Sequence, residues 1–299
     1  MKTSMIDGVV GASPAESKKI MERMRIRFED TYFPQFSPFE KEKTEKELLV
    51  IEDVNKATNE LRKKRGLEPF DIPPDNIHIL KKDKSLPNLI GGFTNPMEGF
   101  ILIQGADTAL QLGKHVFHEM EHAKVHNIVQ VLPESGEIYP FRQGLEVYPR
   151  RQIDRILFPK PETCYFRELS ESVVEEYARR YVMSQLDNPL YTDDFAQTKL
   201  LREEVLKRSQ YSLLLNPEIF QFYLLDNDII CEEFSYRKHR ESLYRIRLAL
   251  SQKYPEKFED SEDVLDLFGD AMFTGKTLEL SRLMEKIFGK GTMRAIGTP

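Results

Sequence analysis

Cysteine and long apolar runs are both scarce in this sequence, and each shortage excludes a class of protein. Cys164 and Cys231 are its only cysteines, so the chain has no disulfide framework of the kind that small secreted proteins use, and a reducing cytoplasm is the expected compartment. Residues 1–17 lack the continuous apolar core of a signal peptide, and no stretch reaches the ~18 apolar residues of a membrane span. We therefore expect a cytoplasmic protein without a membrane partner.

Positive charge is in short supply as well. The 43 lysines and arginines are outnumbered by 49 aspartates and glutamates, which gives a net charge of −6. The basic clusters, at residues 63–65 and 150–151, are too short to outline a surface for a polyanion. We therefore expect no nucleic-acid partner. With 299 residues, of which 40% are hydrophobic, the chain is long enough to bury a large core.

The hydrophobic pattern predicts an α+β protein dominated by helices and divided into three parts. Residues 1–38 contain one amphipathic stretch followed by two prolines, which indicates a loosely attached N-terminal helical arm. Residues 39–190 alternate helices with short strands and form the expected core. Residues 191–299 have helical patterns throughout and predict an all-helical C-terminal subdomain that covers the back of the core.

Within the core, the first predicted helix covers residues 39–66 and ends at Gly66, a glycine placed as a C-terminal cap. Runs rich in β-branched and aromatic residues, bounded by glycine and proline, predict strands after it. The predicted strands lie at 77–80, 89–93, 99–104, 136–141 and 144–149, and the further helices at 105–129 and 163–186.

Histidine is also rare, yet four of the six histidines fall within residues 115–126, in the stretch HVFHEMEHAKVH. Each is three or four positions from the next, and on a helix this spacing stacks all four along one face. The segment HEMEH inside the stretch, residues 118–122, has the form H-E-x-x-H. The pattern raises the question of a metal site.

Zinc prefers neutral imidazole and carboxylate ligands, and His118 and His122, one turn apart, can present two ring nitrogens to a single ion. Glu119 points to the neighbouring side of the helix face, where its carboxylate can reach a water on the ion, as a general base must. The plainer alternative is a solvated helix with clustered histidines. Apolar residues between the histidines argue against it, because they give the helix a surface to bury: Val116, Phe117, Met120 and Ala123.

The helix at 163–186 offers a third ligand. Glu171 and Glu175 are four positions apart and share one of its faces. Most acidic runs are solvated helix faces, and that interpretation is the plainer one here too. The apolar residues around these glutamates nevertheless indicate a buried helix, in which a pair of carboxylates needs a cation.

HEMEH followed 48 residues later by SESVVE resembles the gluzincin metallopeptidases, in which H-E-x-x-H precedes a motif like N-E-A/G-x-T-E on a later helix. FRQGLEV, between the two, and residues 266–296 are similar to segments of small uncharacterised bacterial gluzincin-like proteins. The resemblance covers residues 70 to 295 in outline, but its specific motifs occupy few positions. It implies a zincin-like core, built of a small sheet, the H-E-x-x-H helix and the glutamate helix, with Zn²⁺ as cofactor.

The same resemblance implies a role for each matching residue. His118 and His122 would be zinc ligands, and Glu119 would be the general base. Glu171 would be the third ligand, with Glu175 a supporting carboxylate outside the ligand set. The second motif departs from the family pattern, because Ser170, Ser172 and Val174 stand at its Asn, Gly/Ala and Thr positions.

A competing alignment leaves the third ligand open. The pattern E-x-x-A-x-x-F-A of certain stress-regulatory peptidases matches Glu175, Ala178 and Tyr181, and it would make Glu175 the ligand. We prefer Glu171. Tyrosines at 139, 148 and 177 are candidates for stabilising a developing oxyanion, although packing is the simpler role for each. Glu121 is expected to be solvated.

The sequence thus predicts a zinc-dependent peptidase that acts on a peptide or protein substrate. The strand at 99–104 is expected to pair with an extended substrate, as an exposed sheet edge can. An alternative from another class is a metal-binding regulatory or interaction protein of the same fold, in which the helical tail binds a partner and hydrolysis is slow or absent. A helical structural protein with an accidental motif is the third possibility.

Overall fold

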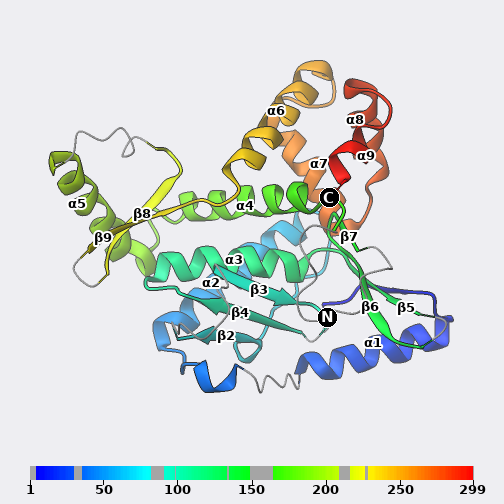
Figure 1. Cartoon of the computed structure of the whole chain (residues 1–299), viewed down its shortest axis with the longest axis horizontal. Coiled ribbons are helices and arrows are strands. Elements are labelled where there is room, and N and C mark those ends of the chain that lie inside the picture. Colours follow the sequence, from blue (N-terminus) through cyan, green and yellow to red (C-terminus); the bar gives the residue numbers. More distant parts are fainter. Residues whose placement is uncertain are drawn as a thin grey trace.

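The computed structural model describes residues 5–29, 36–81, 91–97, 99–132, 135–148, 164–208, 216–225 and 228–298, and every structural statement below concerns these residues. They form an α+β fold dominated by helices, as predicted (Figure 1). None of the helices described combines the length and the apolar character that crossing a membrane requires.

The centre of the fold is a row of three long helices: α2 (Glu45–Lys63), α3 (Ala109–Lys124) and α4 (Arg167–Ser184). Helix α3 packs against both of the others (Figure 1). Helix α2 begins with a capping box, in which the side chains of Thr44 and Glu47 each accept a hydrogen bond from the other's backbone N–H. Helix α3 begins after Thr108, whose hydroxyl accepts from the N–H of Gln111. Local sequence therefore sets where both helices start.

A three-stranded sheet covers one side of α3, in the order β2 (Ile77–Leu80), β4 (Phe100–Gln104), β3 (Gly91–Asn95). Strand β2 runs parallel to β4, and β3 runs antiparallel to it. The three strands predicted in this region are therefore confirmed, although residues 89 and 90 of one of them lie outside the described part of the chain.

The expectation that residues 99–104 pair with a substrate is wrong. Strand β4 occupies the middle of the sheet and is hydrogen-bonded along both of its edges, to β2 and to β3. Its backbone has no row of groups left for another strand. Among the described strands, β3 forms the edge that lies against α3.

A second sheet has four strands, in the order β1 (Gly8–Val10), β5 (Asn127–Val131), β6 (Ile138–Gln143), β7 (Glu146–Val147). The last two confirm the strands predicted at 136–141 and 144–149, and they form an antiparallel hairpin. Strand β1 pairs in parallel with β5. Helix α1 (Pro14–Glu29) follows β1 in the chain. The N-terminal arm thus contains the predicted helix, but β1 attaches it to the sheet through backbone hydrogen bonds, so it is not loosely attached.

The C-terminal part is not all-helical, and that prediction is wrong between residues 219 and 233. Strands β8 (Ile219–Leu225) and β9 (Asp228–Glu233) form an antiparallel hairpin that packs on helix α5 (Thr192–Arg208). The sequence IFQFYLL is a short apolar run, and runs of this length fit a strand as well as a buried helix. The other elements are helices α6 (Arg237–Lys253), α7 (Ser261–Thr274), α8 (Leu278–Phe288) and α9 (Thr292–Gly297), with 3-10 turns at Ser37–Phe39, Pro74–Asn76 and Pro189–Tyr191.

The turn between β6 and β7 lies against α7. Gly144 in this turn has φ 57°, and a Cβ there would come within 2.8 Å of the Met272 side chain. Glycine is therefore required for both backbone conformation and space. Arg142 also joins this turn to the end of α7, because its Nη1 donates to the carbonyl of Gly275 at 3.0 Å.

One apolar core joins the C-terminal helices to the central ones. It contains buried side chains of α2, α3 and α4 together with residues of α7 and α8, among them Leu265, which is fully buried. The helices after residue 260 therefore stabilise the central row by burial of apolar surface.

Leu265→Ala should reduce the free energy of unfolding by about 2–5 kcal/mol, because it leaves a cavity in this shared core. The matched control is Leu278→Ala on α8, where the leucine is 62% exposed. A surface change of this kind should alter the free energy by no more than about 0.5 kcal/mol. Urea denaturation followed by circular dichroism measures both. Equal effects of the two variants would contradict a core shared with the C-terminal helices.

Candidate metal centre

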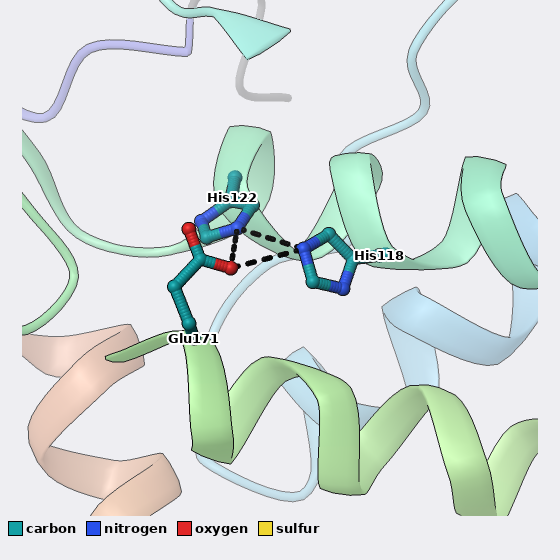
Figure 2. A group of neighbouring side chains, drawn as sticks. All are labelled: His118, His122 and Glu171. Carbon is teal, nitrogen blue, oxygen red and sulfur yellow. Dashed lines mark hydrogen bonds and ion pairs between the residues drawn. The ribbon is translucent and has the colours of Figure 1, made fainter. Parts of the chain in front are cut away.

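The side chains of His118, His122 and Glu171 converge at the contact between α3 and α4 (Figure 2). The two histidine Nε2 atoms are 3.3 Å apart. Glu171 Oε2 lies 3.2 Å from Nε2 of His118 and 3.5 Å from Nε2 of His122. Three atoms of ligand type thus form a nearly equilateral triangle between the helices.

This triangle has the dimensions of a metal site. Zinc binds such nitrogen and oxygen atoms at about 2.0–2.2 Å in tetrahedral geometry, which places neighbouring ligand atoms about 3.3 Å apart. The three observed distances cluster around that value. Glu171 Oε2 is buried and has no hydrogen-bond donor among the described residues, as expected of an oxygen that faces a cation. The group could hold a metal ion.

The surrounding charges favour a cation at this point. Burial by itself would lower the pKa of His118, but its contacts with the carboxylates of Glu171 and Glu175 outweigh burial and raise the pKa to about 10. Burial would conversely raise the pKa of Glu171, yet the adjacent His122 and His118 hold it well below its usual range. A field that holds a proton this strongly also attracts a divalent ion.

Glu175 lies on the other side of the His118 ring. Its Oε2 is 2.9 Å from Nδ1 of His118, and its Oε1 accepts from the backbone N–H of Ser235 at 2.6 Å and from Lys114 Nζ at 2.9 Å. The carboxylate is fully buried and all of these contacts are charge-assisted. Glu171 therefore shares the Nε2 side with His122, whereas Glu175 orients the ring from behind, as carboxylates beside metal-bound histidines do.

Glu119 is held against strand β3. The hydroxyl of Thr94 lies 2.8 Å from both the backbone carbonyl and Oε2 of Glu119, and a Cβ at Gly92 would come within 2.6 Å of its Cγ. Burial lowers the pKa of His122, but Glu171 and, less strongly, Glu119 raise it, so the charge of Glu119 acts at the triangle. Glu119 is near the metal position without belonging to the ligand group.

Tyr236 completes the surroundings of the site, although no pattern in the sequence pointed to it. It lies between β9 and α6 in a left-handed conformation, with φ 55°. Its ring is parallel to that of His118, at a centroid distance of 6.3 Å and an angle of 9°. Burial and, after it, the charge of the nearby Glu171 raise the pKa of the Tyr236 hydroxyl.

The tyrosines considered from the sequence have other partners. Tyr139 donates to Glu137, Tyr148 contacts the side chains of Gln143 and Glu146, and Tyr177 binds Arg65 and the carbonyl of Leu265. No short motif distinguishes Tyr236 from the chain's other tyrosines, because its position depends on where the hairpin joins α6.

The prediction that Glu121 is solvated is wrong. Its side chain is fully buried, and neither carboxylate oxygen has a hydrogen-bond partner among the described residues. Burial raises its pKa to about 7 despite the nearby charges of Arg65 and His122. Of the flanking histidines, His115 lies 3.8 Å from Glu232, and His126 lies 4.0 Å from Asp7.

Comparison of the sequence with models of known protein families found no match, and comparisons with curated proteins and with solved structures found none either. The gluzincin resemblance therefore rests on the short motifs and on the arrangement of these side chains.

Glu171→Ala and Glu175→Ala should separate the two glutamates. The first removes one corner of the triangle and should abolish most zinc binding. The second leaves the triangle intact and should weaken affinity by about 10–100-fold, the usual effect of losing a partner of a metal-bound histidine. Titration with a chromophoric zinc chelator measures both. The reverse order of effects would favour the alignment in which Glu175 is the ligand.

Proposed function

We propose that the protein is a zinc-dependent peptidase in which Glu119 is the general base. The observation that carries this proposal is the joint placement of the His118–His122–Glu171 triangle and of Glu119 beside it. When bound, zinc would polarise the carbonyl of the scissile bond and make a water more acidic. Two histidines and one carboxylate leave a fourth tetrahedral position for that chemistry, which is the pattern of catalytic rather than structural zinc sites.

Glu119 is suited to take the proton from the attacking water. Its carboxylate lies about 100° around α3 from His118, so it can reach the reacting water without competing for the metal. The Thr94 hydroxyl fixes Oε2, which restricts the side chain to a narrow set of conformations. The glutamate can then return the proton to the leaving amine.

Tyr236 is suited to stabilise the negative charge that develops on the carbonyl oxygen. Tyr236 is 38% exposed, and Glu171 lies close enough for its charge to act on the hydroxyl. The raised pKa keeps that hydroxyl protonated, so it is available as a donor. The parallel position of the ring beside that of His118 supports this role.

Strand β3 offers a backbone surface for an extended substrate. It is the outer strand of its sheet and lies against α3, the helix that carries Glu119. A peptide that adds to this edge would gain main-chain hydrogen bonds and would pass the face of α3 that holds the two histidines. The substrate class is therefore an unfolded or extended polypeptide.

Glu119→Gln should lower peptidase activity by at least about 100-fold, because it removes the general base. The amide can still accept the hydrogen bond of Thr94, so zinc content and melting temperature should stay close to those of the unchanged protein. The assay uses zinc-loaded protein and a panel of unstructured peptides. Glu168→Gln, on the exposed side of α4, is the matched control and should retain full activity.

Two outcomes would contradict this role. Loss of zinc from the Glu119→Gln protein would identify Glu119 as a ligand. Full activity with zinc retained would mean that another base acts. If the unchanged protein binds one zinc per chain but cleaves none of the peptides, the metal-binding regulatory protein becomes the better description.

Tyr236→Phe tests the second group. Removal of one oxyanion donor should reduce kcat by about 100-fold with little change in KM, because the hydroxyl acts mainly in the transition state. Tyr244→Phe on α6, where the tyrosine is 52% exposed, serves as the control. Steady-state kinetics with one cleaved peptide give both constants. A rise in KM alone would instead assign Tyr236 to substrate binding.

A further inference from the structure

The face of α3 that carries His118 and His122 continues to His115, three residues before His118. On one side of His115 is strand β3, since a Cβ at Gly91 would lie 3.5 Å from its ring. On the other side is strand β9, whose Glu232 places Oε1 3.8 Å from Nε2 of His115. One turn further, Gln111 Nε2 donates to the other oxygen of Glu232 at 3.2 Å. The β8–β9 hairpin thus positions the Glu232 carboxylate beside the route that an extended substrate would follow along β3.

The charge of Glu232 is not balanced by a cation within the described part of the chain. Its structural contacts are a neutral amide, Gln111, and an imidazole. Burial lowers the pKa of His115, so that imidazole is neutral at neutral pH. Lys114 is adjacent in sequence, but its ammonium group is bound to Glu175. The Glu232 side chain keeps 29% of its surface exposed, so a ligand can reach it.

We propose that Glu232, supported by Gln111 and His115, forms a subsite for a lysine or arginine side chain of the substrate. This inference rests on the proposed peptidase function. A carboxylate held by two side chains at fixed geometry can form a charge-assisted hydrogen bond with such a cation. We therefore expect the protein to prefer substrates with a basic residue close to the scissile bond.

The distance along α3 limits which substrate residue the subsite receives. His115 lies three residues before His118, which is about 4.5 Å along the axis of α3. An extended chain advances about 3.3 Å per residue. The preferred basic side chain should belong to a residue one or two positions from the bond that is cleaved.

The first test changes the substrate and leaves the protein as it is. Each unstructured peptide carries one lysine, or one acetyllysine in its place, at a different position near one cleavable bond. Acetylation removes the charge and keeps the aliphatic part of the side chain. At one position, lysine should raise kcat/KM by about 10-fold over acetyllysine, the lower end for a hydrogen bond to a charged group. Equal values at every position would overturn the subsite, while the cleavage itself would leave the proposed function standing.

The second test assigns the preference to Glu232. Glu232→Gln keeps the shape of the side chain and a hydrogen bond with Gln111 but removes the charge, so the lysine preference should fall to within twofold of unity. The matched control, Glu233→Gln, changes the next residue of β9, which is exposed and points to the opposite face of the hairpin. It should retain the preference. An undiminished preference in the Glu232→Gln protein would overturn the inference.

A binding measurement separates this inference from the proposed function. Fluorescence anisotropy of labelled lysine and acetyllysine peptides with the zinc-loaded Glu119→Gln protein reports affinity without turnover. If the lysine preference disappears in the double variant Glu119→Gln, Glu232→Gln, the subsite is supported. This holds even if no peptide is ever cleaved by the unchanged protein, and then only the peptidase proposal fails. Equal binding of the two peptides to the Glu119→Gln protein overturns the subsite.

Discussion

The structure depends on the contact between two imidazoles of α3 and two carboxylates of α4. His118 lies between Glu171, on its Nε2 side, and Glu175, on its Nδ1 side. Ionised carboxylates are costly to bury, and these two are 6% and 0% exposed. They are tolerated because each faces an imidazole, and Glu175 also faces Lys114. A metal ion in the triangle would supply the positive charge that Glu171 Oε2, which has no hydrogen-bond partner among the described residues, favours.

The part of the chain after residue 190 contributes directly to the site. Sequence patterns assign it to a scaffold behind the core, yet β9 and the start of α6 bring three groups to the helix face. The backbone N–H of Ser235 binds Glu175, Tyr236 lies over His118, and Glu232 reaches His115. The hairpin therefore flanks this face of α3 on one side, and β3 flanks it on the other. Any substrate preference of the proposed peptidase would arise between the hairpin and β3.

Buried charge elsewhere in α3 constrains how the helix can move. The Lys124 side chain is fully buried and its ammonium group contacts Asn55, Thr58 and Asn59 of α2. Burial lowers its pKa to about 7, because removing that charge from water is costly. These hydrogen bonds fix the C-terminal end of α3 against α2. With the histidines bonded to α4, the helix is held from both sides, as a site with positioned groups requires.

The sequence alone determined the features that depend on helix periodicity. The spacing of His118 and His122 places both on one face of α3, and Glu119 must then point to the neighbouring side. Only the tertiary structure decided which glutamate joins the histidines. Glu171 and Glu175 share a face but differ by about 6 Å along the axis of α4, so the choice depends on how far α4 is shifted relative to α3.

The same distinction explains the predictions that were wrong. Whether β3 or β4 forms an edge depends on strand order, which local patterns do not encode. The burial of Glu121 depends on helices that pack on α3 from distant parts of the chain. Tyr236 and Glu232 reach the site because an apolar run folded as a hairpin, and a run of that length acquires its conformation from the surface it packs on. Short-range spacing therefore predicts the candidate ligands on α3. The elements that flank them, β3 and the β8–β9 hairpin, are placed by contacts between residues far apart in the sequence.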